Sequence, residues 1–174
     1  MSCFGDRVRI GVIADTHGLF DQAILRHFRG VDHIIHAGDI GGRSVIRELE
    51  AIAPVTAVSG NADGYGRSGF KGATVIELAG KRIAVRHILY EGGKLTKEGQ
   101  AFLERERPDV CIFGHTHRPT CERFGDTLLF NPGSAGPKRF TLPRGLGLLT
   151  IAGAAVTPRL LRLADRPEAI ASSR

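Results

Sequence analysis

Hydrophobic and polar positions in the first sixty residues follow two alternating patterns. Near-continuous apolar runs cover residues 8–15, 32–39 and 55–61, as in strands that are covered on both faces of a sheet. Between them, residues 21–29 and 42–53 carry apolar side chains at the spacing of one helix face. This repeated order of strand and helix predicts a parallel sheet with right-handed crossovers.

The second half of the chain is richer in strands. Apolar runs on either side of Gly80 and Lys81 predict a hairpin, and residues 95–107 predict a helix that begins at Thr96 and ends at Pro108. A short apolar stretch at 110–113 precedes further expected strands at 120–124, 127–130, 145–151 and 155–163. The pattern predicts an α/β protein with two mixed sheets flanked by helices.

The length of 174 residues suits a single domain with a real core. We expect that domain to cover residues 1–165, followed by a frayed tail of small and polar residues at 166–174. No apolar run approaches the about 20 residues that a membrane-spanning helix needs. Three cysteines without a paired spacing indicate reduced thiols, so we expect a cytoplasmic protein without a membrane partner.

The net charge of +6 allows two interpretations. A basic surface attracts nucleic acid or small anionic substrates, but it can also be a solvated surface without a partner. Basic residues are scattered and are not interleaved with aromatic ones, so a nucleic acid is not favoured as a stable partner.

Side chains that can bind a metal follow one predicted strand after another. They are Asp15 and His17 in "ADTHG", Asp39 in "HAGD", Asn61 in "SGN", His87 in "VRH", and His115 and His117 in "FGHTH". The carboxyl ends of parallel strands line one crevice, so these side chains are expected to meet. Residues at i and i+2 of an extended segment point the same way, so His115 and His117 should face one point.

Seven ligands are too many for one tetrahedral ion, but they suit two ions that share a carboxylate. The mixture of imidazole nitrogen with carboxylate and amide oxygen, without thiolate, indicates Mn, Fe, Ni, Co or Zn in a catalytic site.

The ordered motifs D-x-H, G-D, G-N, a lone H and G-H-x-H resemble those of the calcineurin-like metallophosphoesterase superfamily. The chain is similar in particular to the small bacterial and archaeal phosphodiesterases, the branch that also includes the retromer scaffold subunit. The resemblance runs from Asp15 to the segment "NPGSAGPKR", which ends at Arg139. It implies a four-layer αββα sandwich and hydrolysis of a small phosphoester, with manganese the favoured metal.

The resemblance also implies roles for individual residues. Asp15, His17 and His117 would hold the first ion, while Asn61, His87 and His115 would hold the second. Asp39 would bridge both ions and the hydroxide that attacks phosphorus, with Asn61 and His115 as further catalytic residues. Arg118 and Arg139 are candidate substrate contacts, and His36 is a candidate to support the ligands by hydrogen bonding.

Two positions depart from the family pattern. Larger family phosphatases have a histidine directly after the G-N pair, where this chain has Ala62. Its absence favours substrates with good leaving groups, hence a phosphodiesterase over a phosphomonoesterase. The lone histidine is usually followed by glycine, whereas His87 is followed by Ile88. A buried structural histidine is therefore the alternative interpretation of His87.

Two other functions stay open at this point. One is a catalytically weak protein-binding scaffold with the same fold, and the other is a nucleic-acid-binding protein with structural metals. A homo-oligomer is compatible with the sequence.

Overall fold

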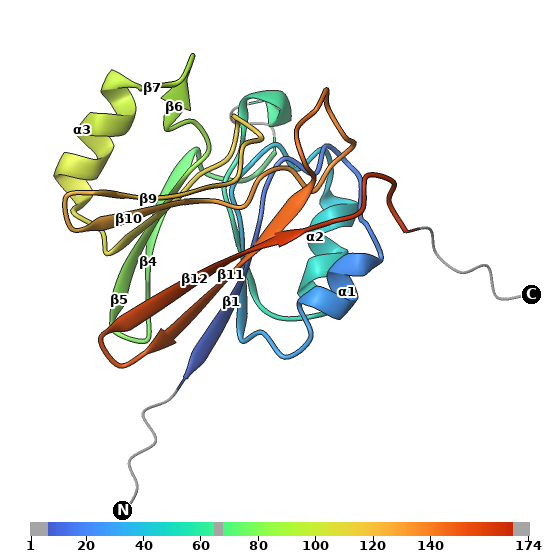
Figure 1. The fold of residues 1–174 in the computed structure, drawn as a ribbon, viewed down its shortest axis with the longest axis horizontal. Coiled ribbons are helices and arrows are strands. Elements are labelled where there is room, and N and C mark those ends of the chain that lie inside the picture. Colours follow the sequence, from blue (N-terminus) through green and yellow to red (C-terminus); the bar gives the residue numbers. More distant parts are fainter. Residues whose placement is uncertain (1–6, 65–67, 169–174) are drawn as a thin grey trace, which may run out of the picture.

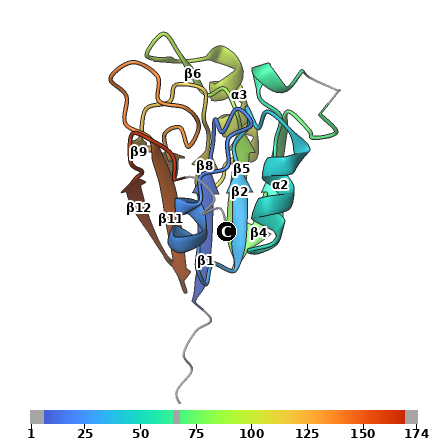
Figure 2. The same ribbon diagram turned by 90° about the vertical axis from the view of Figure 1, so that its right-hand side faces the viewer.

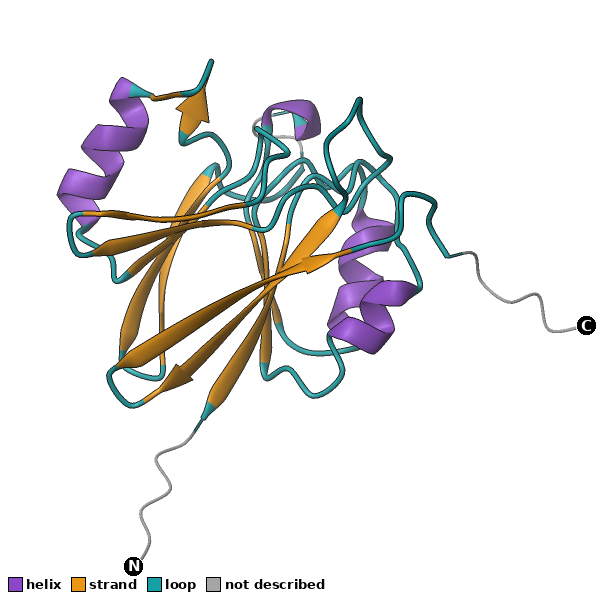
Figure 3. Ribbon diagram, in the orientation of Figure 1, coloured by secondary structure: helices purple, strands orange, loops and turns teal. Residues whose placement is uncertain are grey.

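The computed structural model describes residues 7–64 and 68–168 as two five-stranded mixed sheets with few helices (Figures 1 and 3). The first sheet has the strand order β12-β11-β1-β2-β3. Its strands are β1 (Val8–Ile13), β2 (His33–His36), β3 (Val55–Ala57), β11 (Gly145–Ala152) and β12 (Ala155–Arg162). β1, β2 and β3 are parallel, and β11 and β12 extend the sheet in antiparallel fashion.

The second sheet has the strand order β4-β5-β8-β10-β9. Its strands are β4 (Ala73–Leu78), β5 (Lys81–Arg86), β8 (Val110–Ile112), β9 (Thr120–Phe124) and β10 (Thr127–Asn131). β5, β8 and β10 run parallel, while the edge strands β4 and β9 close hairpins. A separate two-stranded hairpin, β6 (Tyr90–Glu91) and β7 (Lys94–Leu95), was not predicted from the sequence.

The helices lie on the outer faces of the two sheets: Figure 1 shows α3 on one side of the sheets and α1 and α2 on the other, and Figure 2 views the molecule from the side of α1 and α2. α1 (Ala23–His27) and α2 (Arg43–Glu50) cover the first sheet, and α3 (Lys97–Glu106) covers the second. The resulting order of layers is the four-layer αββα sandwich that the family resemblance implied. Within the described residues, no helix is long and apolar enough to span a membrane.

Side-chain alternation along the strands explains the layers. Ile10 and Val12 of β1 pack with Phe130 of the second sheet, while Ile13 packs under the helices with Phe28. Each such fully buried side chain contributes about 1.5–3 kcal/mol to folding through removal of apolar surface from water.

Several helices and strands were predicted to be longer than they are. The helix expected over 21–29 covers only 23–27, because the side chain of Asp21 accepts a hydrogen bond from the amide of Ala23 and Gly30 leaves the helical conformation (φ +72°). The helix expected over 42–53 ends at Glu50, ahead of Pro54, which disfavours helix in the residue before it. The third strand ends at Ala57, and a 3₁₀ turn, η1 (Asn61–Asp63), follows it.

The expected tail over 166–174 falls partly outside the described residues. Glu168 lies against α1, where its carboxylate forms an ion pair with Arg26 at 2.8 Å. Its amide also donates to the Asp21 carboxylate at 3.1 Å.

Candidate metal centre

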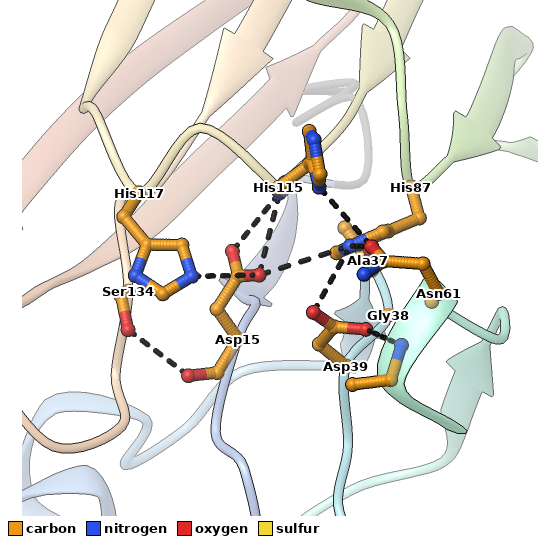
Figure 4. Close-up of polar contacts among 12 residues, drawn as sticks. Asp15, Ala37, Gly38, Asp39, Asn61, His87, His115, His117 and Ser134 are labelled. Carbon is orange, nitrogen blue, oxygen red and sulfur yellow. Dashed lines mark hydrogen bonds and ion pairs between the residues drawn. The ribbon is translucent and has the colours of Figure 1, made fainter. Parts of the chain in front are cut away.

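The loops that follow β1, β2, β3, β5 and β8 converge at one edge of the sandwich and bring all seven predicted ligand residues together. Figure 4 labels six of them, all except His17. Both sheets run their parallel strands toward this edge, so the carboxyl ends of strands from two sheets face one cleft.

One group of candidate ligand atoms comes from Asp15, His17 and His117, whose ligand atoms all lie within 4.8 Å of one another. The Nε2 atom of His117 lies 3.3 Å from Oδ1 of Asp15 and 3.5 Å from Nε2 of His17. Asp15 and His117 are buried, and His17 is partly exposed. Two ring nitrogens and a carboxylate oxygen thus point at one small volume.

A second group contains Asp39 and His87. Nε2 of His87 lies 3.3 Å from Oδ2 of Asp39 and 3.9 Å from Oδ1 of Asp15. The same Oδ2 of Asp39 lies 3.8 Å from Nε2 of His17 in the first group. The carboxylate of Asp39 therefore stands between the two groups.

Asn61 joins the second group through its amide oxygen. Oδ1 of Asn61 lies 3.1 Å from Nε2 of His87 and 3.1 Å from Nδ1 of His115. Asn61 is exposed and His115 is partly exposed, so this side of the centre opens to solvent.

His115 and His117 do not face one point, which corrects the sequence interpretation. Both residues have left-handed backbone conformations, with φ of +67° and +56°, and the segment is not an extended strand. The chain turns between them, so His117 points to Asp15 and His115 points to Asn61 (Figure 4).

Left-handed backbone is a general property of this centre. Among the described residues, eight other than glycine have positive φ, and five of them are candidate ligands: Asp15, His17, Asp39, His115 and His117. Such conformations cost on the order of 1–3 kcal/mol each and persist only where surrounding contacts impose them. Strained backbone clusters at active sites and ligand clamps, so its concentration on these residues makes the cleft the candidate metal centre.

Backbone hydrogen bonds hold the first two loops together. The amide of Asp15 donates to Gly38 O at 3.0 Å, and the amide of His17 donates to Asp39 O at 2.9 Å. Gly41 packs so closely on this ladder that a Cβ atom would lie 2.2 Å from the amide nitrogen of Gly18. The two loops therefore form one rigid unit.

The "NPGSAG" segment supports the ligands from outside the cleft. Ser134 donates its hydroxyl to the carbonyl of Asp15 at 3.0 Å, and the amide of Gly136 donates to the same carbonyl at 3.0 Å. The buried side-chain amide of Asn131 donates to Gly114 O at 3.0 Å, just before His115. The sequence analysis identified this segment only as the end of the family resemblance and did not single out Asn131 or Ser134.

His36 supports the loops, and among the described residues its ring hydrogen-bonds to no candidate ligand side chain. Its Nδ1 accepts from the amide of Gly38 at 3.2 Å, so Nε2 donates to the hydroxyl of Thr16 at 2.9 Å. Thr16 in turn donates to Ile40 O at 2.8 Å. Burial lowers the pKa of His36 to about 4, so this ring is neutral at pH 7.

The charges in the centre are strongly coupled. Burial pushes the pKa of Asp39 upward, but the hydrogen bond and charge of His87 outweigh it and bring the pKa down to about 2. Burial pushes the pKa of His87 downward, but the hydrogen bond to Asp39 and the Asp15 carboxylate raise it above its usual value. For His17, burial is the larger effect, and it lowers the pKa despite the Asp39 carboxylate.

The tautomer of His87 fits a metal ligand. Its Nδ1 lies 2.7 Å from Ala37 O, a carbonyl that can only accept, so Nδ1 carries the hydrogen. Nε2 faces Asp15, Asp39 and Asn61, and it is the nitrogen that can offer a lone pair to a metal ion once its own proton, which is shared with Asp39, is lost. A backbone carbonyl that orients the ring in this way is the usual partner of a metal-binding histidine.

The two candidate substrate contacts lie on different sides of the centre. Arg118 is exposed and lines, with His115, Glu91 and Tyr90, a hollow of about 530 Å³. Arg139 is also exposed, and its charge is close enough to depress the pKa of His17.

The donor set suits one or two divalent ions. Two carboxylates, four imidazoles and one amide oxygen surround the cleft, and each of the two groups offers at least three donors. Mixed nitrogen and oxygen ligands with no thiolate are typical of Mn, Fe, Co, Ni or catalytic Zn.

Known proteins resemble this chain in sequence and in fold. A probable metallophosphoesterase of Methanothermobacter thermautotrophicus is 34% identical, with 88% of this chain and 91% of that protein covered. A phosphodiesterase of Methanocaldococcus jannaschii is 28% identical, with 72% and 83% covered. Vacuolar protein sorting 29 of Cryptosporidium parvum has a TM-score of 0.76 at 19% identity, with 91% and 93% covered, which shows a shared fold.

The family comparison agrees with the geometry. The family model of the calcineurin-like phosphoesterase superfamily domain matches residues 8–154, a range that contains all seven candidate ligands. This is a metal-dependent family, and the superfamily motifs quoted from the sequence fall on the residues that meet in the cleft. The chain therefore belongs to the calcineurin-like phosphoesterase superfamily.

Proposed function

We propose that this protein is a phosphodiesterase that depends on two divalent metal ions, with manganese as the favoured metal. The single observation that carries the proposal is the position of Asp39. Its Oδ2 lies 3.8 Å from His17 Nε2 on one side and 3.3 Å from His87 Nε2 on the other, where a carboxylate can serve two ions.

In this proposal, Asp15, His17 and His117 would hold the first ion, and Asn61, His87 and His115 would hold the second. Asp39 would be a ligand common to both. The two ions would supply Lewis-acid activation of water and of the phosphoryl oxygens.

The chain's own residues prepare the cleft for an anionic substrate. The two buried carboxylates offset only half of the charge of two divalent ions, so the loaded centre is positive and favours a phosphate group. Arg118 and Arg139 add two cations at the rim, where they can orient the phosphate oxygens that face away from the ions.

The neighbours of Asn61 favour diesters with good leaving groups. Ala62 follows Asn61, at the position where larger phosphatases of the superfamily have a histidine that assists the leaving group. An alanine methyl cannot give a proton to a departing alkoxide. The relative named a phosphodiesterase supports the same substrate class.

The proposal includes a cytoplasmic location and a small phosphoester as the substrate. Two cysteines in the described chain are free thiols, and burial raises the pKa of the Cys111 thiol to about 12, which makes it unreactive. Free thiols persist in a reducing compartment.

A metal-dependence assay tests the function. The protein is stripped with a chelator and assayed on bis(para-nitrophenyl) phosphate and on para-nitrophenyl phosphate, with and without added Mn²⁺. We expect hydrolysis only with Mn²⁺, and a higher kcat/KM for the diester. Two bound ions without hydrolysis of either ester would contradict the proposal and favour a scaffold with this fold.

A further inference from the structure

Asp63 makes an unusual set of contacts beside the candidate metal centre. Its carboxylate accepts hydrogen bonds from three backbone amides: Oδ2 from Gly60 at 2.8 Å and from Ile40 at 3.1 Å, and Oδ1 from Gly41 at 3.0 Å. Ile40 and Gly41 belong to the loop after β2, while Gly60 belongs to the loop after β3. One side chain thus ties two loops together.

Those loops carry two of the candidate ligands. Asp39 directly precedes Ile40, and Asn61 directly follows Gly60. The loops also touch directly, since the amide of Ala62 donates to Oδ1 of Asp39 at 2.8 Å. A Cβ atom on Gly60 would lie only 2.1 Å from that same Oδ1, so the two loops pack too closely to accept a larger residue there.

Only a carboxylate can make this connection. An ionised aspartate accepts at both oxygens and donates from neither, so it can satisfy three N–H groups that converge on it. Hydrogen bonds to a charged acceptor are also roughly twice as strong as neutral ones. An asparagine of the same shape would place an NH₂ group against at least one of the three amides.

We infer that Asp63 is a positioning residue that fixes Asp39 relative to Asn61 and thereby sets the affinity of the second metal ion. The inference rests on the proposed two-ion function and deepens it. The loop of Asp15 has separate supports in Ser134 and Gly136. Removing the Asp63 carboxylate should therefore weaken binding of the second ion and leave binding of the first ion unchanged.

The test compares Asp63→Asn with a matched variant, Asp109→Asn. Oδ2 of Asp109 also accepts a backbone amide, that of Arg82 at 2.8 Å, but Asp109 precedes β8, at the opposite end of this strand from the cleft. Mn²⁺ binding is measured by titration calorimetry, and pairing of the ions by the exchange-coupled electron paramagnetic resonance signal of a manganese pair. Thermal unfolding monitors the fold.

For Asp63→Asn we expect the dissociation constant of the second Mn²⁺ to rise about 10- to 100-fold, the usual effect of removing a group that orients ligands. The coupled signal should be lost while one ion stays bound, and Asp109→Asn should behave as the unchanged protein. Retention of the coupled signal, or an equal loss of both ions in a folded variant, would overturn the inference. If the unchanged protein gives no coupled signal, the proposed function itself fails.

A measurement on the unchanged protein covers the case in which Asp63→Asn does not fold. The amides of Ile40, Gly41 and Gly60 should exchange with deuterium slowly, since each is bound to the carboxylate. Rapid exchange at all three would overturn the inference without any variant.

Discussion

The two halves of the metal centre differ in burial and in charge. The half made by Asp15, His17 and His117 contains a fully buried carboxylate of its own and a histidine that is only 7% exposed. The half made by Asn61, His87 and His115 has no carboxylate of its own, and although His87 is buried, His115 is partly exposed and Asn61 is exposed. Asp39 belongs to both halves.

This difference predicts that the two halves bind their metal ions with different affinities. A divalent ion gains more from a carboxylate plus a shared carboxylate than from the shared carboxylate alone. We therefore expect the buried half to fill first and hold its ion more tightly. The open half, next to Arg118 and the hollow beside Tyr90, is where substrate and the second ion can enter together.

The largest effect is expected from removing the feature that the halves share. Asp39→Asn keeps the shape but removes the charge between the two groups, so kcat/KM for the diester should fall by on the order of 1,000-fold. Asp109→Asn, at the other end of β8, should retain activity. Equal activity in Asp39→Asn and the unchanged protein would show that the shared carboxylate has no catalytic role.

Acid should lower the free energy of unfolding, because His36, which hydrogen-bonds to the loops of Asp15 and Asp39, is buried as a neutral ring. Its folded pKa of about 4 lies below the ordinary 6.5, so the unfolded chain binds the extra proton and stability is lost as the pH falls from 6.5 through 4. The loss should reach about 3 kcal/mol in the metal-free protein. His87, whose folded pKa is raised, contributes stability with the opposite sign, which fades as the pH rises above 6.5.

Urea unfolding at several pH values measures this effect. His36→Gln should flatten the dependence of the unfolding free energy between pH 6.5 and 4. An identical slope in the variant would mean that another group causes the acid sensitivity.

A matched pair of histidine variants separates the two halves. His117→Ala should weaken binding of the tightly held first ion by roughly 100-fold, whereas His115→Ala should leave one tight ion and weaken only the second. Mn²⁺ titration calorimetry of both variants gives the two dissociation constants. If both variants lose the same ion, the assignment of these neighbours to different halves is wrong.

The smallest expected effect is the loss of stability when one side-chain hydrogen bond to the backbone of each half is removed. Ser134→Ala removes a buried hydrogen bond to Asp15 O and should cost about 1 kcal/mol of stability. Thr120→Ala removes a similar bond to Arg118 O on the exposed side and should cost little. Thermal unfolding of the two variants compares them; a larger cost for Thr120→Ala would reverse the contrast between the halves.

The sequence predicted the strands well because burial leaves a clear periodic signal. The second-half strands from 120 onward agree with the structure to within a residue, and the helix capped by Thr96 was also confirmed. The short β6–β7 hairpin was not predicted, because strands of two residues are too short to have a detectable hydrophobic pattern. The helices after β1 and β2 were predicted too long, since local caps and Pro54 end them early.

The candidate ligands could be predicted because each follows a strand whose end is visible in the sequence. Their orientation could not, since the left-handed turns at His115 and His117 depend on contacts with distant loops. The residues that support the ligand loops could not be predicted either, because they also act through contacts between distant parts of the chain. Asp63, Asn131 and Ser134 act on loops 15 or more residues away in the chain, and nothing local distinguishes them from ordinary turn residues.

Crystals grown with Mn²⁺ provide the most direct test of the shared-carboxylate centre. An anomalous difference map recorded at the manganese edge should contain two peaks about 3.5–4 Å apart, one on each side of Asp39. The stronger peak should lie in the buried half with Asp15. No peak among the seven side chains, or a single peak that Asp39 does not contact, would contradict the account.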